Sequence, residues 1–478
     1  MMNELIRMSA REAVRRLEAG EVTPLQLIDA AVARIEEVEP VLNAVPTLCV
    51  ERARTQAKRI MAGEITPTGD GRGWLAGLPV VIKDLNEVEG VRTTHGSPIF
   101  ADHVPTSSGY EVERLEAHGA VILGKSNTPE FGAGAQTFNE VFGVTRNPWN
   151  TALTCGGSSG GAAVALAAGE IWLANGSDLG GSLRTPAGYC SVVGLRPSPG
   201  RVPHGPGGNP FGTLSVEGPM GRDVRDVALL LDAQAGHDPR DPLSYPAPAR
   251  PYAETVEDRP TLRRVAYSAD LGGITPVDPE VAAICRAAAE RFAGLGVEVI
   301  ENSCPDLDKA VDVFNVLRAE NFVISRAPLL EKHRDKLKPE VIWNIERGLE
   351  LSAGDIGRAE RDRAAMQRSM AAFLDEHDLL LCPTSIVPPF PVEQRYIEEL
   401  HGHRFPSYID WVSITFAITV TGCPVLSLPC GFTSTGLPVG LQLVGKPRDE
   451  AGLLAAAAML EDALGIARQV PLDPRRPG

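Results

Sequence analysis

Two glycine-rich loops, each carrying serine, lie within residues 154–186 and constrain the fold more than any other feature of the chain. The first loop is Gly156-Gly157-Ser158-Ser159-Gly160-Gly161, and the second is Asp178-Leu179-Gly180-Gly181-Ser182. Glycine beside serine lets the backbone approach a ligand closely, and successive free N–H groups can hold a developing oxyanion. Between the loops, residues 162–168 predict a tightly packed helix and residues 171–174 predict a buried strand.

These loops resemble the signature of the amidase signature family, in which a GGSSGG loop is followed by a Gly-Gly-Ser-x-Arg loop. Here the second part reads Gly181-Ser182-Leu183-Arg184. The family also has a lysine in an upstream Gly-Leu-Pro…Lys-Asp segment, and this chain has Gly77-Leu78-Pro79-Val80-Val81-Ile82-Lys83-Asp84. All three parts occur in the family's order, so the resemblance extends beyond one motif.

The alternation of short apolar strands with helices from Leu75 onward predicts an α/β fold with a mostly parallel sheet. The resemblance implies the same class: an α/β/α sandwich with a large mixed, mostly parallel central sheet. It further implies a hydrolase that cleaves a carbonyl–nitrogen bond outside peptides, in an amide, anilide or carbamate, with esters as further substrates. No cofactor or metal is implied, and the expected partner is a small-molecule substrate.

The resemblance also implies a role for each motif residue. Ser182 is the expected nucleophile of an acyl-serine intermediate, Ser158 relays the proton, and Lys83 is the base, with a cis peptide before Ser158. A serine needs such a base, and burial at the end of an apolar strand favours the neutral form of Lys83. The expected oxyanion hole consists of the amides of Leu179, Gly180, Gly181 and Ser182. The expected supporting residues, which could equally form a buried polar network without a catalytic part, are Gly157, Ser177, Asp178 and Arg184.

Two other motifs suggest different chemistry. Residues 119–126 match the P-loop pattern, but their middle is an apolar strand that follows a helix, which is the wrong context. Lys125 is therefore the weaker candidate for the base. Residues 157–161 match the G-x-S-x-G elbow of Ser-His-Asp esterases, but no good strand precedes them.

Metal-dependent and partner-dependent functions are also less favoured. The nine histidines are scattered, and only His401 and His403 lie close together, as expected for a solvated loop pair. Some members of the family are amidotransferase subunits that act on charged tRNA together with a partner. These usually have Gln after the Ser-x-Arg, where this chain has Thr185, and this difference favours a stand-alone hydrolase.

Composition limits the partners and the location. The 46 Lys and Arg against 61 Asp and Glu give a net charge of -15, which argues against binding to nucleic acid or anionic membranes. The N-terminus lacks the apolar core of a signal peptide, so we expect a cytoplasmic protein. We further expect a monomer or homodimer. None of the eight cysteines forms a Cys-x-x-Cys pair, and Cys155 alone abuts a serine loop.

The chain reads as one domain, 1–478, with a helical arm at 1–70 and a helical embellishment at about 261–378. The Gly- and Pro-rich residues 199–218 read as a long loop, and such loops are often functional. We expect the substrate pocket to be lined by residues 199–215 and 383–411. The aromatic residues there, which could instead belong to the core, are Phe211, Phe390, Tyr408 and Trp411.

Overall fold

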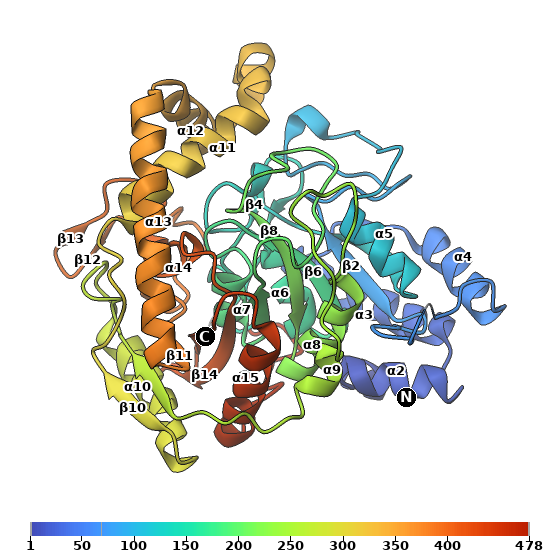
Figure 1. Ribbon diagram of the computed structural model, residues 1–478. Helices are drawn as coiled ribbons and strands as arrows, with labels where there is room; N and C mark the ends of the chain where they lie inside the picture. Colours follow the sequence, from blue (N-terminus) through green and yellow to red (C-terminus); the bar gives the residue numbers. More distant parts are fainter. Residues whose placement is uncertain (1, 68, 477–478) are drawn as a thin grey trace.

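An eleven-stranded sheet crosses the part of the chain that the structure, a computed structural model, describes: residues 2–67 and 69–476 (Figure 1). The order of the strands is β1-β3-β2-β6-β8-β7-β14-β15-β11-β9-β10. In this order, their bounds are Thr47–Leu48, Val121–Ser126, Pro79–Lys83, Leu173–Asp178, Val216–Gly221, Val193–Arg196, Val425–Phe432, Pro438–Val444, Leu379–Pro383, Arg264–Tyr267 and Glu298–Glu301.

The sheet is mixed, as predicted, but the prediction that it is mostly parallel is wrong. Among the described residues, six of its ten strand pairings are antiparallel. Two features account for the difference. Strands β14 and β15 form a hairpin, and β8 lies antiparallel between β6 and β7. Half of β8 falls within the predicted loop 199–218, because Gly218 and Pro219 hide the strand pattern.

Helices cover both faces of the sheet, and β11 shows how the two faces separate. Leu379 and Leu381 pack in one hydrophobic cluster with α10 (Pro279–Gly294) and α15 (Glu450–Leu464), whereas Leu380 and Cys382 pack in another with α11 (Ala310–His333) and α13 (Ala353–Glu376). This follows from the alternation of side chains along a strand. The predicted α/β/α sandwich is therefore confirmed. The longer helices are α3 (Pro24–Leu42), α4 (Val50–Met61), α8 (Val224–Gln234), α10 (Pro279–Gly294), α11 (Ala310–His333), α12 (Pro339–Leu349), α13 (Ala353–Glu376) and α15 (Glu450–Leu464).

The remaining elements are short. They comprise helices α1 (Met2–Leu5), α2 (Ala10–Glu18), α5 (Tyr110–Ala117), α6 (Gly160–Ala167), α7 (Arg184–Cys190), α9 (Tyr252–Thr255) and α14 (Ser413–Thr419), and the strand pairs β4 (Phe138–Asn139) with β5 (Gly143–Val144) and β12 (Glu399–Leu400) with β13 (His403–Arg404). The predicted helix at 162–168 corresponds to α6, whose residues are all buried. The predicted strand at 171–174 begins two residues later, as β6.

Two paired glycines let the second serine loop pack onto the sheet. Gly176 on β6 lies opposite Gly218 on β8. A Cβ at Gly176 would lie 2.7 Å from Cδ2 of Leu183, and one at Gly218 would lie 2.8 Å from its Cδ1. Because such contacts are too short for any side chain, the pair forms a hollow that seats Leu183, the residue after Ser182.

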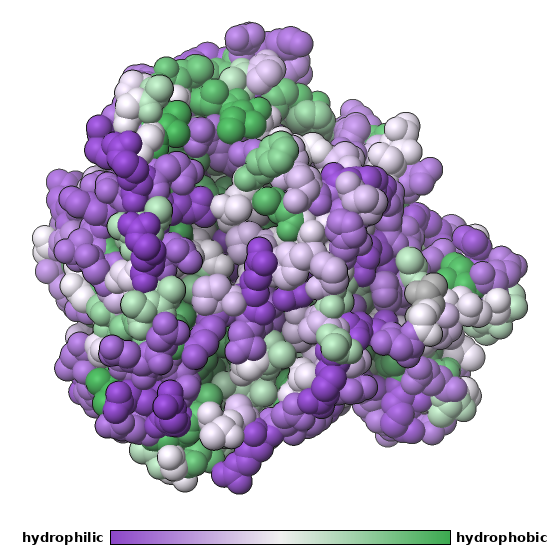
Figure 2. Space-filling view, viewed as in Figure 1, coloured by the Kyte–Doolittle hydropathy of each residue, from purple (hydrophilic) through white to green (hydrophobic). Residues whose placement is uncertain are grey.

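The surface is mostly hydrophilic in the view of Figure 2, and hydrophobic residues gather at its top, over α11 and α12. Ile324 and Leu349, on these two helices, are about half exposed. No helix within the described residues has the length and apolar character needed to span a membrane.

Candidate active site

Lys83, at the end of β2, lies between the two serine loops. Its side chain is fully buried, and Nζ lies 2.7 Å from Oγ of Ser158 and 2.8 Å from Oγ of Ser159. Nζ also lies 3.0 Å from Oγ of Ser177 on the neighbouring parallel strand β6. The Lys83 amide donates to Oδ1 of Asn175 at 2.8 Å. These contacts fix Lys83 in position relative to both loops.

Burial lowers the pKa of Lys83 to about 7, although the charges of Glu217 and Asp178 act to raise it. A lysine in water has a pKa near 10.4 and is almost entirely protonated at neutral pH. Here a large fraction is neutral near pH 7. A neutral amine has a lone pair that can accept a proton from a serine hydroxyl, which an ammonium group cannot do.

Ser158 and Ser159 are adjacent, but their environments differ. The peptide between Gly157 and Ser158 is cis, as the resemblance implies. Ser158 lines a cavity, whereas Ser159 is fully buried behind it and its Oγ also lies 3.3 Å from the carbonyl oxygen of Ser177. Three serine hydroxyl groups contact Lys83, and those of Ser158 and Ser177 belong to residues that line the cavity, whereas that of Ser159 does not.

The second loop presents Ser182 to the same cavity. The Ser159 amide donates to the Ser182 carbonyl at 3.1 Å, so the two loops are joined directly. Among the four predicted oxyanion donors, the amide of Gly181 already donates to Oδ1 of Asp178 at 2.9 Å. Leu179, Gly180 and Ser182 line the cavity, and within the described residues their amides have no hydrogen-bond partner.

Asp178 and Arg184 hold the second loop in place through hydrogen bonds. The fully buried carboxylate of Asp178 accepts two hydrogen bonds from Arg184, both of 3.0 Å, and one from the Leu183 amide at 3.1 Å. Burial alone would raise the pKa of Asp178, but the charges of Arg184 and Arg196 hold it well below its usual range. Neither Asp178 nor Arg184 lines the cavity, so both position the loop rather than contact a substrate.

The cavity has a volume of about 190 Å³, and its wall differs from the predicted one. The loop between β7 and β8 contributes, as predicted, with His204, Asn209 and Ser215, but the predicted segment 383–411 contributes only Ile409. Helix α11, which the sequence did not place at the site, supplies a whole side of the wall. Its lining residues are Phe314, Arg318, Asn321, Phe322, Ser325 and Arg326.

The four aromatic candidates do not line this cavity. Phe390 and Trp411 belong to a hydrophobic core cluster, and Phe211 points outward with 74% of its surface exposed. Tyr408 accepts hydrogen bonds of 2.6 Å from Arg318 and Asn344. The aromatic residues of the cavity are instead Phe131, Phe314 and Phe322.

Glu217 is a cavity residue that could not be identified from the sequence. It lies on β8, directly opposite Ser177 of β6, and only 3% of its side chain is exposed. Its Oε1 lies 3.2 Å from Nδ1 of His204. The only signal in the sequence was a single acidic residue in a Gly- and Pro-rich stretch, which is typical of a solvated loop.

Three other candidates lie apart from this chemistry. Lys125 donates to Oγ1 of Thr93 at 2.8 Å and does not line the cavity. Cys155 is fully buried, and burial raises the pKa of its thiol to about 12, so it is a poor nucleophile. His401 and His403 are exposed, as predicted.

Comparisons with known proteins find relatives that match nearly the whole chain. Residues 26–454 match the model of the Amidase family. The chain is 34% identical over 469 residues to an acylamidase of Rhodococcus erythropolis, covering 98% of this chain and 97% of that protein. It is 35% identical over 476 residues to a glutamyl-tRNA(Gln) amidotransferase subunit of Synechococcus sp. (strain CC9605), covering 95% of each. A solved structure of 6-aminohexanoate cyclic dimer hydrolase with substrate is 29% identical and superposes with a TM-score of 0.88, covering 98% of this chain and 99% of that one.

Proposed function

The chain belongs to the amidase signature family, and from this premise we propose that it is a stand-alone hydrolase that cleaves carbonyl–nitrogen bonds through an acyl-serine intermediate. One observation carries the proposal. The buried Nζ of Lys83 lies 2.7 Å from Oγ of Ser158, which lines the same cavity as Ser182. The base Lys83, the proton relay Ser158 and the nucleophile Ser182 are therefore grouped on one side of the cavity.

In the proposed reaction, Oγ of Ser182 attacks the substrate carbonyl. Ser158 takes the proton of Ser182 while passing its own proton to the neutral amine of Lys83. The carbon–nitrogen bond then breaks, and the leaving nitrogen receives the proton back through Ser158. Water then enters, passes a proton through Ser158 to Lys83 and attacks the acyl carbonyl. The bond to Ser182 breaks, and the Ser182 oxygen takes that proton back through Ser158 as the acid leaves.

We assign the oxyanion hole to the amides of Leu179, Gly180 and Ser182. The amide of Gly181 is the exception among the four predicted donors, because Asp178 already accepts its hydrogen bond. Removing one oxyanion donor typically raises a barrier by about 3–4 kcal/mol. By accepting the hydrogen bond of the Gly181 amide, Asp178 fixes the loop in the conformation in which Leu179, Gly180 and Ser182 line the cavity.

The size and lining of the cavity support small substrates. About 190 Å³ suits a compact acyl group, and the rings of Phe131, Phe314 and Phe322 offer apolar surface to it. We therefore propose amides, anilides and aryl carbamates rather than peptides. The names of the relatives support this class, since one is an acylamidase and another hydrolyses a cyclic dimer of 6-aminohexanoate.

A role as one subunit of an amidotransferase is the second candidate, because relatives with that name match nearly the whole chain at 33–36% identity. The side chain that distinguishes the two candidates is Thr185, which lines the cavity beside Ser182. The glutamine usual at this position in such subunits is absent, which favours the stand-alone enzyme.

The test uses the purified chain alone with a chromogenic anilide, a primary amide, an aryl carbamate and an aryl ester. We expect hydrolysis of at least one amide or anilide, and labelling by a fluorophosphonate at Ser182 that Ser182→Ala abolishes. A label on Ser159 would indicate the elbow of a Ser-His-Asp esterase instead. Activity that appears only with charged tRNA and a second protein chain would establish the amidotransferase.

A further inference from the structure

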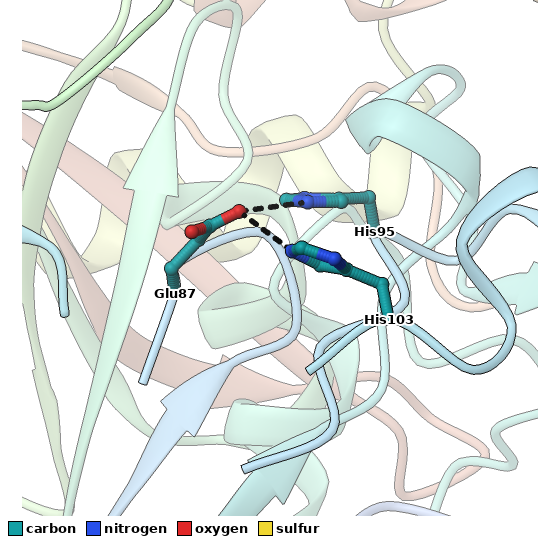
Figure 3. Close-up of side chains that lie close together, drawn as sticks. All are labelled: Glu87, His95 and His103. Carbon is teal, nitrogen blue, oxygen red and sulfur yellow. Dashed lines mark hydrogen bonds and ion pairs between the residues drawn. The ribbon is translucent and has the colours of Figure 1, made fainter. Parts of the chain in front are cut away.

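Three potential metal ligands meet outside the cavity, in the segment that connects β2 to α5. Figure 3 shows the side chain of Glu87 facing the rings of His95 and His103. Oε1 of Glu87 lies 3.6 Å from Nε2 of His95 and 3.2 Å from Nε2 of His103. The three ligand atoms all lie within 4.8 Å of one another. This cluster could not be recognised from the sequence, because its members are eight residues apart and form no metal-binding motif.

These separations suit a tetrahedral ion. Bonds of about 2.0–2.1 Å at tetrahedral angles place neighbouring ligand atoms about 3.4 Å apart. The two distances from Glu87 lie on either side of this value, and the remaining pair of ligand atoms, one from each histidine, lies within 4.8 Å. Two imidazole nitrogens with one carboxylate is a ligand set that Zn²⁺ uses in proteins, with water in the fourth position.

The backbone holds each ligand residue in place. The amide of His95 donates to the Asp84 carbonyl at 2.9 Å, and its carbonyl accepts from the Phe131 amide at 2.8 Å. The carbonyl of His103 accepts from the Thr93 amide at 3.0 Å, and that of Glu87 accepts from the Gly109 amide at 2.9 Å. The cost of ordering these residues is thus largely met by the fold before any ion binds.

The cluster is open to solvent on one side. The side chain of His95 is 15% exposed, while those of Glu87 and His103 are 34% and 35% exposed. An ion can enter from solution, and a water molecule can complete its coordination. None of the three residues lines the cavity, so an ion here would not touch the substrate.

We propose that Glu87, His95 and His103 bind one divalent transition-metal ion, with Zn²⁺ as the best match. The site goes beyond the proposed hydrolysis and supplies no group to it. Its effect is on the segment between β2 and α5: the ion would tie three points of this segment together. Since His95 is hydrogen-bonded to Phe131, a residue of the cavity wall, the ion would also stiffen that wall.

The test is a calorimetric titration of the full, chelator-treated chain with Zn²⁺, together with thermal unfolding. We expect one equivalent to bind and to raise the unfolding temperature. His103→Gln and Glu87→Gln should each weaken binding by more than about 100-fold, beyond the loss typical of residues that only orient a ligand. A His401→Gln/His403→Gln double variant is the matched control and should bind as the unaltered protein does.

A second measurement distinguishes the site from a simple carboxylate–imidazole hydrogen-bond cluster. Co²⁺ in place of Zn²⁺ should give the intense visible absorption of a tetrahedral complex in the unaltered protein and lose it in His103→Gln. Absence of Zn²⁺ binding, or binding that survives in both ligand variants, overturns the proposal. Fluorophosphonate labelling of Ser182 in the same variants shows that they are folded, and its failure in the unaltered protein would affect the proposed function alone.

Discussion

Lys83 and Lys125 lie on neighbouring parallel strands but on opposite faces of the sheet. Lys125 of β3 pairs with Ile82, the residue before Lys83 on β2, and side chains alternate along a strand. Both lysines are fully buried, and burial lowers the pKa of Lys83 to about 7 and that of Lys125 to about 8. A lowered pKa therefore does not identify the base, and the partners of each amine must decide. Lys83 contacts serines, whereas Lys125 forms an ion pair with Asp84 at 3.8 Å.

The first prediction compares these two lysines. Lys83→Met keeps most of the apolar stem and removes the amine, and it should slow acylation by about 100- to 10,000-fold, the usual contribution of a general base. Lys125→Met should leave acylation by the folded protein nearly unchanged, although loss of the ion pair with Asp84 lowers stability. Single-turnover kinetics check both variants, with folding verified by circular dichroism. The reverse result would move the base to Lys125.

The second prediction concerns pH. Acylation requires neutral Lys83, so its rate should rise with pH and reach half its maximum near pH 7. The charge of Glu217 acts to raise the pKa of Lys83, because a nearby anion stabilises the ammonium form. Glu217→Gln removes that charge, so the rising limb should move to lower pH. The exposed Glu36→Gln changes net charge equally and should leave the limb in place; an unmoved limb in Glu217→Gln contradicts the assignment.

The third prediction separates the two adjacent serines. Both hydroxyl groups contact Lys83, but only Ser158 lines the cavity. Ser158→Ala should slow acylation by amides by about 100-fold or more, while reactive esters retain some turnover. Ser159→Ala should have a much smaller effect. Burst kinetics with an anilide and an ester measure both variants, and equal losses would show that Ser159 shares the relay.

The fourth prediction concerns stability. Asp178→Asn leaves two buried arginines without their carboxylate and should cost about 3–5 kcal/mol of unfolding free energy at neutral pH. The folded-state pKa of Asp178 is below its unfolded value, so the carboxylate contributes fully above about pH 4 and its contribution is lost as pH falls through the folded value. The difference between variant and unaltered protein should therefore shrink in acid.

Urea unfolding at several pH values measures this effect. The control is Asp462→Asn, which breaks an ion pair of 2.8 Å with Arg225 on the surface. Such exposed pairs contribute about 0–1 kcal/mol. Equal costs for Asp178→Asn and Asp462→Asn would show that the buried network does not anchor the serine loop.

The apolar pattern of the sequence predicted the sheet and its helices, whereas the residues that meet around Lys83 were implied by the resemblance of three short motifs to the amidase signature family. The apolar pattern could not predict β8, since the glycines and proline of Val216–Gly221 are normally signs of a loop. Because half of β8 was predicted as a loop, Glu217 was not recognised as a cavity residue; it lies at the cavity because β8 pairs with β6.

The residues that form the cavity wall could not be predicted from the sequence either. Phe314, Arg318 and Phe322 recur at helical spacing on α11, and this pattern is the same whether the face packs against a core or borders a cavity. The prediction that Phe390 and Trp411 line the cavity was wrong for the same reason, because a large ring in a loop region can as readily pack in the core. Only the docking of α11 over the serine loops, a tertiary event, decides between these outcomes.

The hollow formed by Gly176 and Gly218 has a consequence for how such enzymes diversify. A Cβ at Gly176 would also lie 2.7 Å from Oγ of Ser159, and one at Gly218 would collide with the carbonyl oxygen of Leu195, so a smaller residue in place of Leu183 would not make room for a side chain at either glycine. The residues of α11 that border the cavity have no such tie to the two glycines. In a directed-evolution library the hollow should therefore stay invariant while α11 accumulates substitutions, so that substrate range can drift without rebuilding the reactive loop.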